Sequence, residues 1–169
     1  MEKRITSHIQ KGCIVAITYI LFNTVITFAK ISNAQWTDFV AWFIIIVGTL
    51  LSVHLFGKQN QNNQPFGSLF SHGFKTAAVA TCLIFIYVLV MIYIVNPSMI
   101  TDKVNEIVAE AKKQHPIADE KAMKEFAANA FKITKLMIIA GTIMGTLFLG
   151  IIGSLVGAVA TPKQNLQTK

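Results

Sequence analysis

The chain has 169 residues, of which 53% are hydrophobic and only 14% charged, with a formal net charge of +7. About a quarter of the residues of an average soluble domain are charged, and here the apolar residues form long blocks, so we expect a single membrane domain over residues 1–169. A basic excess beside membrane spans is typical of positive-inside bias and of attraction to anionic lipid, so membrane lipid is the expected partner, and nucleic acid is not.

The first predicted span covers about residues 12–29, after a basic N-terminal segment, and we interpret it as a signal anchor that stays in place. Tyr19, Asn23 and Thr27 recur every four residues and so form a polar stripe on one helical face. Such residues form interhelical hydrogen bonds worth about 1 kcal/mol or less each, and we favour this role over contact with a substrate.

The second predicted span covers about residues 36–56, and the short turn before it makes the first two helices antiparallel neighbours. Trp36 and Trp42 are expected at the headgroup level near its start. His54 lies near its other end, which favours an interfacial histidine over a buried proton relay. An amide-rich loop follows over residues 57–65.

The third predicted span covers about residues 76–95 and ends at Asn96 and Pro97. Before it, Phe66, Phe70 and Phe74 recur every four residues and give a short aromatic face. This spacing favours a segment that lies at the membrane interface and leads into the span.

The composition changes sharply after the third span, where acids and lysines alternate with apolar residues at helical spacing. We predict two amphipathic helices, at about residues 98–114 and 119–135, with a break at His115 and Pro116. The second is expected to continue into a fourth span, residues 136–160, whose uncharged run is long enough to cross a bilayer core of about 30 Å. The expected fold is all-α: a polytopic membrane protein with four transmembrane helices and an amphipathic helical hairpin between helices three and four.

Glycines punctuate the fourth span. Two pairs of them, Gly141 with Gly145 and Gly153 with Gly157, fall at the four-residue spacing that lets helix backbones approach closely in lipid. All four glycines are therefore predicted to pack against helices, within the bundle or in a homo-oligomer.

The distribution of charge predicts the orientation of the chain. The face that carries both termini and the amide-rich loop has seven basic residues against eight on the other face, but it concentrates them at the membrane ends. Because the positive-inside rule acts most strongly near span ends, we expect both termini in the cytoplasm.

The chain resembles a known family in several soft motifs. These are the entry to the third span (Phe66-Gly67-Ser68 to Gly73-Phe74-Lys75), the Asn96-Pro97 exit, the amphipathic insert and the glycine-rich last span. Over about residues 12–163 it is similar to the bacterial membrane proteins of domain of unknown function 4199 (DUF4199). The resemblance implies a four-helix inner-membrane protein without assigned catalytic residues, and gene neighbourhood with a polyprenyl-phosphate-type glycosyltransferase.

Motifs that would indicate catalysis are missing from the sequence. The glycine-rich patterns G-x-x-x-x-G-K-[ST] and G-x-G-x-x-G, which bind phosphate groups, do not occur. The histidines His8, His54, His72 and His115 fall in separate segments, so no metal or cofactor site is expected. The acids all lie outside the apolar cores of the spans. Since a coupled transporter normally needs an ionisable residue facing the bundle interior, this pattern argues against transport.

Three functional hypotheses remain. We favour a non-enzymatic scaffold or accessory subunit of a membrane complex, with a polyprenyl-phosphate-type glycosyltransferase as one client. The alternative is a small transporter or lipid flippase in which Asn23, Thr27 and His54 line a path. An enzyme acting on lipid through His72 or His115 ranks last, because no second catalytic group can be placed beside either histidine.

Overall fold

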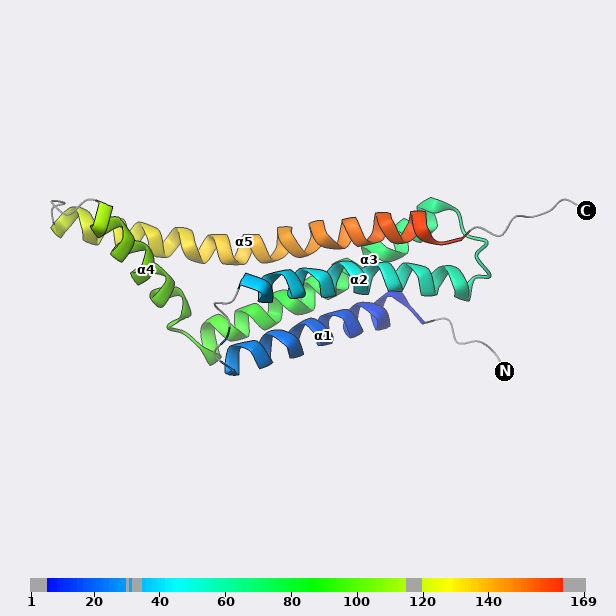
Figure 1. The fold of residues 1–169 in the computed structure, drawn as a ribbon, viewed down its shortest axis with the longest axis horizontal. Helices are drawn as coiled ribbons and strands as arrows, with labels where there is room; N and C mark the ends of the chain where they lie inside the picture. Colours follow the sequence, from blue (N-terminus) through cyan, green and yellow to red (C-terminus); the bar gives the residue numbers. More distant parts are fainter. Residues whose placement is uncertain (1–5, 30, 32–34, 115–119, 163–169) are drawn as a thin grey trace, which may run out of the picture. The chain divides into compact units, whose positions relative to one another are not determined.

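The structure is a computed structural model and describes residues 6–29, 31, 35–114 and 120–162. Within these ranges every regular element is helical. The predicted break at His115 and Pro116 lies outside them. In chain order the elements are α1 (His8–Phe28), α2 (Gln35–Gln59), α3 (Phe66–Val90), the short π-helix η1 (Met91–Val95), α4 (Met99–Gln114) and α5 (Glu120–Ala160) (Figure 1).

Four helical segments are long and apolar enough to cross a membrane, judged by length and composition: His8–Phe28, Trp36–Gln59, Phe66–Val95 and Lys121–Ala160. The prediction of an all-helical chain with four apolar spans is thereby confirmed for the described residues, and the spans indicate a multi-pass membrane protein. Several helices begin earlier than the predicted spans. Caps and backbone hydrogen bonds, rather than apolarity alone, decide where a helix starts.

A capping box starts α1 at His8, ahead of the apolar run. The Ser7 hydroxyl accepts a hydrogen bond from the Gln10 backbone N–H at 3.3 Å, and the Ser7 N–H donates to Gln10 Oε1 at 3.1 Å. This reciprocal pair satisfies backbone donors that a helix start otherwise leaves unpaired. The cap therefore brings Lys11 into the helix instead of leaving it in the N-terminal segment.

The aromatic segment before the third span belongs to the same helix as the span, because α3 runs without a break from Phe66 to Val90. Ring centroids lie 6.2 Å apart for Phe66 and Phe70 and 6.3 Å apart for Phe70 and Phe74. The three rings therefore stack along one face of the first turns of α3.

The described residues form two compact units. The first, called here the four-helix unit, contains α1, α2, α3 up to Ile84 and α5 from Met144 onward. The second, called here the charged unit, runs from Phe85 to Ile143 and contains the end of α3, η1, α4 and the first part of α5.

In the four-helix unit, the start of α1, the α2–α3 connection and the end of α5 lie at the same end (Figure 1). Gln59 Nε2 donates to Thr6 Oγ1 at 2.7 Å, which ties the first two of these segments together. Gly57 lies against the Thr161 side chain and ties in the third. An apolar cluster packs near this end and consists of Val53, Leu69 and Ala158 with Phe56 and Phe70 against them.

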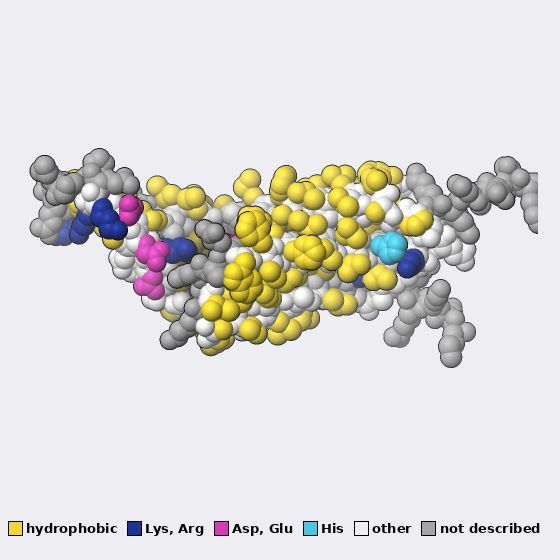
Figure 2. All heavy atoms as spheres, viewed as in Figure 1, with side chains coloured by type: hydrophobic (Ala, Val, Ile, Leu, Met, Phe, Trp, Pro, Cys, Tyr) yellow, Lys and Arg dark blue, Asp and Glu magenta, His cyan; other side chains and the backbone are white. Residues whose placement is uncertain are grey.

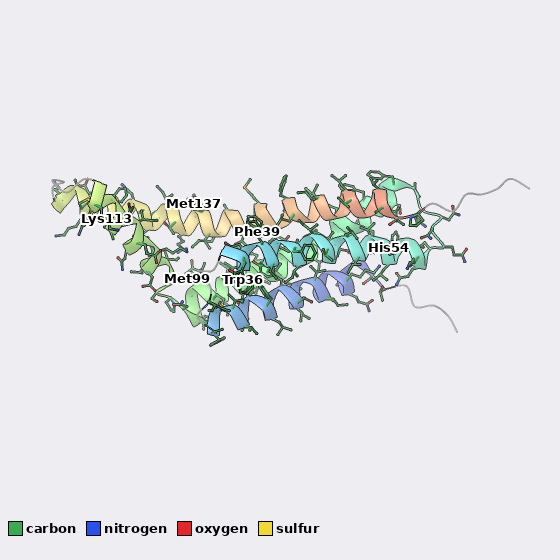
Figure 3. The ribbon with its side chains drawn as sticks, in the orientation of Figure 1. Trp36, Phe39, His54, Met99, Lys113 and Met137 are labelled. Carbon is green, nitrogen blue, oxygen red and sulfur yellow. The ribbon has the colours of Figure 1, made fainter. Side chains whose placement is uncertain are left out.

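The outer surface of the four-helix unit is apolar, as Figure 2 shows for one face. Leu21 is 61% exposed, Phe39 65% and Phe148 63%, on three different helices. Trp36 and Phe39 lie near the start of α2, while His54 is near its other end (Figure 3). Lipid tails are as apolar as such side chains, so this surface suits a bilayer.

The charged unit has exposed charges on α4 and the first part of α5, whereas the last residues of the third span are exposed and apolar, as Ile94 is at 73%. Its buried residues Ile92, Ile100 and Val104 come from η1 and α4, and Val88, Val108, Ala130 and Ile138 pack against them. Lysine and acid side chains gather on the surface of this unit (Figure 2). One exposed ion pair joins Lys113 Nζ to Glu110 Oε2 at 3.3 Å.

Candidate functional site

A polar cluster is buried at the end of the four-helix unit where α1 starts. It joins Lys11 of α1, Ser52 and Gln59 of α2, and His72 and Thr76 of α3, and is called here the Lys11 cluster. The exposed fraction is 5% for Lys11 and 8% for His72. Lysine is almost never this buried without partners, so the cluster is the strongest functional candidate in the described part of the chain.

The Lys11 ammonium makes three contacts, one for each N–H that it carries. Its Nζ lies 3.2 Å from the Ser52 carbonyl oxygen, 3.3 Å from Gln59 Oε1 and 3.3 Å from His72 Nε2. No carboxylate oxygen of the described residues lies within 4 Å of it. Among the described residues the cation is therefore solvated by a carbonyl, an amide and an imidazole, and not by a carboxylate.

The His72 ring is held between aromatic groups. It stacks on Phe56 with centroids 3.9 Å apart, and the His8 ring meets it edge-on at 6.1 Å. The Lys11 ammonium also lies 5.6 Å from the centre of the Phe56 ring, within the range of a cation–π interaction. When Lys11 is protonated it can only donate, so His72 Nε2 accepts and Nδ1 carries the ring proton.

Hydroxyl groups fix the α2–α3 side of the cluster. Thr76 Oγ1 donates to the His72 carbonyl at 2.9 Å, and it lies 2.9 Å from Ser52 Oγ. Ser52 and Thr76 are 2% and 0% exposed. Because the Ser52 and Thr76 hydroxyl groups are paired with each other and with the backbone, they can stay buried in apolar surroundings.

The expectation that no ionisable residue faces the bundle interior is wrong, because Lys11 and His72 both do. Lys11 is buried because its neighbour Gly12 lets α1 approach α3 closely: a Cβ added at Gly12 would lie 2.8 Å from the Thr76 carbonyl oxygen. The signal in the sequence is the small pair Gly12 and Ala16, four residues apart, directly after the lysine.

The predicted polar stripe of α1 bonds to its own helix. Asn23 Nδ2 donates to the Tyr19 carbonyl at 3.0 Å, and Thr27 Oγ1 donates to the Asn23 carbonyl at 2.8 Å. Tyr19, Asn23 and Thr27 are each half-buried. These two bonds lie within α1 rather than between helices. That the stripe makes hydrogen bonds to another helix stays a prediction.

Two of the predicted packing glycines, Gly153 and Gly157, lie against α2. A Cβ added at Gly153 would lie 2.5 Å from the Ile46 carbonyl oxygen, and one at Gly157 would lie 3.1 Å from the Leu50 carbonyl oxygen. Gly150, which was not among the predicted residues, lies against the Ala77 side chain of α3. Only glycine leaves room for backbones this close.

Gly141 and Gly145 do not lie at such a contact. A Cβ added at either would meet no heavy atom of the described residues within 4 Å. At about 100° per residue, these two glycines point to a different side of α5 from Gly150, Gly153 and Gly157, which explains the difference. The four-residue spacing was correct for a helix face, but the two pairs lie on different faces.

In the part of the chain that the structure describes, the histidines do not join a metal-binding group. Among the described residues, no three His, Cys, Asp or Glu side chains lie close enough together to hold a metal ion. His54 is half-buried on α2, and His115 lies outside the described residues. The described residues of the Lys11 cluster supply an ammonium and an imidazole, which can hold an anion or pass a proton between Lys11 and His72.

Comparison with known proteins gives a family and no closer relative. No curated protein and no solved structure matches the chain significantly. Residues 10–163 match a protein family that is described as a protein of unknown function, DUF4199. This match covers nearly the whole chain and confirms the resemblance that its motifs suggest, so the chain belongs to the DUF4199 family.

Proposed function

We propose that the protein is a non-enzymatic scaffold or accessory subunit of a membrane complex and that α5 carries its partner contact. The length of α5 is the observation that supports this most. Its 41 residues extend about 60 Å at 1.5 Å per residue, whereas a bilayer core is about 30 Å thick. About half of the helix therefore exceeds what is needed to cross the membrane.

The excess length forms, with α4, an amphipathic hairpin outside the bilayer between the third and fourth spans. Ala130 of α5 packs on the cluster of Ile100 and Val104 from α4, which supports this arrangement. Three lysines of this segment, Lys121, Lys124 and Lys132, are exposed. One face thus packs on α4 while the other meets water.

Apolar side chains on the excess length supply a contact surface. Phe126 is 41% exposed, Phe131 40% and Ile133 56%. In a segment surrounded by charges, exposed aromatic residues are typical anchors of protein interfaces. A membrane protein with a part outside the bilayer is the partner that such a helix can reach.

The client is a polyprenyl-phosphate-type glycosyltransferase of the bacterial inner membrane, in keeping with the family resemblance. Both termini of the present protein are cytoplasmic in this proposal, and the hairpin lies on the opposite side. Single-cysteine variants test the orientation: a membrane-impermeant thiol reagent applied to intact cells labels Lys113→Cys and not Asn63→Cys. The opposite labelling pattern would mean that both termini lie outside the cytoplasm.

Site-specific photo-crosslinking tests the scaffold function. A photoreactive residue at Phe126 is expected to give one dominant protein adduct in native membranes. The same residue at Val25, which is 64% exposed on α1, gives lipid adducts only. Deleting the gene should also lower the activity or membrane retention of the crosslinked protein. Lipid adducts at both positions, with only monomer or homodimer in intact-complex mass spectrometry, would contradict the proposal.

A transporter or lipid flippase is the second candidate, and the buried Lys11 and His72 favour it. Ionisable residues inside a membrane bundle commonly mark ion or substrate pathways. Reconstituted vesicles provide the test: transport of a lipid or solute that stops with His72→Leu, but continues with Lys58→Gln at an exposed position of α2, supports this function. Vesicles in which both variants retain the wild-type rate would exclude a pathway through the Lys11 cluster.

A further inference from the structure

A groove of about 410 Å³ runs between α1 and α2 in the four-helix unit. Val15 and Gly48 both line it and meet each other, because a Cβ added at Gly48 would lie 2.8 Å from Val15 Cγ2. Its sides are apolar and exposed: Ile14 is 64% exposed, Phe43 65% and Leu51 49%. The volume falls in the range of about 300–1,000 Å³ that is usual for small-molecule sites.

The groove is about as long as one lipid leaflet is thick and, like a leaflet, it is polar at one end and apolar along the rest. Its lining on α2 extends from Phe43 to Leu55, which is about 18 Å along the helix axis. One leaflet of the hydrocarbon core is about 15 Å thick. Lys11 and Ser52 form the polar end, near the start of α1 and toward the end of α2, while nearly all the remaining lining is hydrocarbon.

Lys11 gives the polar end of the groove a positive charge. It is the one charged residue among the described residues that line the groove. Its three contacts measure 3.2 to 3.3 Å, longer than the 2.7–2.9 Å of strong charge-assisted hydrogen bonds. A buried ammonium is costly unless it is paired with an opposite charge. An anionic group at this end would supply the counter-ion that the described chain does not.

We propose that the groove binds one anionic phospholipid, with an acyl chain between α1 and α2 and its phosphate beside Lys11. The charge of Lys11 selects a headgroup with net negative charge. The apolar lining selects a lipid tail. A zwitterionic phospholipid has the tail without the net charge, and inorganic phosphate has the charge without the tail. The site belongs to the four-helix unit, whereas the α5 contact proposed above belongs to the charged unit, and lipid binding does not depend on a protein partner.

Intact-protein mass spectrometry of the full chain in mild detergent tests the site. The protein is titrated with phosphatidylglycerol, with phosphatidylcholine of the same acyl chains, and with inorganic phosphate. One phosphatidylglycerol is expected to bind about fivefold or more tightly than phosphatidylcholine, as expected for roughly one lysine at an anionic lipid surface. Equal binding of the two lipids, or displacement of bound lipid by inorganic phosphate, would overturn the proposal.

A matched pair of charge variants locates the binding to Lys11. Lys11→Gln should weaken phosphatidylglycerol binding about fivefold. Lys58→Gln removes the same charge from an exposed position in the last turn of α2 and should leave binding unchanged. An equal loss in the two variants would mean general surface attraction and would overturn the assignment.

A second pair of variants tests the groove without disturbing the Lys11 cluster. Ile14→Trp places a large ring in the groove, whereas Ile17→Trp places it at a position of α1 that is 54% exposed and does not line the groove. Ile14→Trp should abolish the retained lipid at an unchanged melting temperature, and Ile17→Trp should keep it. Equal lipid retention by the two variants would exclude the groove as the binding site.

Discussion

The four-helix unit and helix α4 of the charged unit arrange polar and apolar side chains in opposite ways. In the four-helix unit, polar side chains such as Lys11 and His72 are buried while apolar ones face outward. In the charged unit, α4 buries Ile100 and Val104 and carries its lysines and acids outside, although Ile94 at the end of the third span is 73% exposed. Water makes this second arrangement favourable on α4 through the hydrophobic effect. Lipid permits the first, because polar groups find no partners in hydrocarbon and must pair with one another.

Helix α5 belongs to both units. The comparison shows how one helix can combine a part suited to water with a part suited to lipid. Its backbone pairs its own N–H and C=O groups throughout, so nothing in the main chain marks the change of solvent. The side chains mark it instead. Charged residues occupy the part before Leu136, and glycine with large apolar residues occupies the part after it.

Ile100→Ala should give the largest effect, because it tests whether the charged unit has a core of its own. Ile100 is 3% exposed, and removing its side chain from the cluster should cost about 2–5 kcal/mol. Hydrogen exchange should speed up in α4 and stay unchanged in α1 and α2. The control Ile107→Ala lies on the same helix at 43% exposure. Equal exchange in the two variants would show that this cluster does not hold α4.

Gly153→Leu tests the close packing of the four-helix unit, with Gly145→Leu as its control. The new side chain at position 153 would meet the Ile46 carbonyl, which belongs to the backbone and cannot turn away. Overpacking of this kind costs about 1–3 kcal/mol. Gly145 has open space around it, so its variant should melt like the wild type in detergent. A similar drop in melting temperature for both would mean that the space at Gly145 is filled in solution, as in a homo-oligomer.

A double-mutant cycle between Lys11 and His72 tests the buried polar pair. His72→Leu removes one acceptor from a buried ammonium and should cost about 1–3 kcal/mol. Combining it with Lys11→Met replaces both partners by apolar groups, so the double variant should lose less than the sum of the single losses. Thermal unfolding in detergent gives the four values. Additive losses would show that the two side chains do not interact.

The smallest effect is expected on the surface of the charged unit. Lys113 and Glu110 form an ion pair with side chains 75% and 60% exposed. Exposed pairs of this kind contribute about 0.2–1 kcal/mol at most, and salt screens them. Lys113→Gln should therefore leave the melting temperature unchanged within error at 150 mM salt. A clear loss of stability would point to a contact made by Lys113 beyond this pair.

Much of the fold was predictable because its signals are local. Long apolar runs mark the four spans, and helical spacing continues through the charged segment into the last span. Helix starts were predicted less well. The cap at Ser7 and the aromatic turns from Phe66 lie in polar or mixed sequence, where hydrogen bonding and not hydrophobicity decides the boundary.

The candidate site was predicted poorly, for a different reason. Lys11 stands next to an apolar run and resembles an interfacial charge, and His72 has no sequence neighbour that suggests a partner. They meet because Gly12 brings α1 close to α3. Contacts between residues 61 positions apart in the chain cannot be read from spacing within one helix.

The sequence by itself determined the family, the helical class and the four apolar spans, because each depends on motifs or on composition along a short stretch. The tertiary structure decided which glycines of α5 pack, that a lysine and a histidine are buried together, and that a groove lies between α1 and α2. These depend on how far each helix is rotated about its axis and shifted along it, and packing against the neighbouring helices sets both.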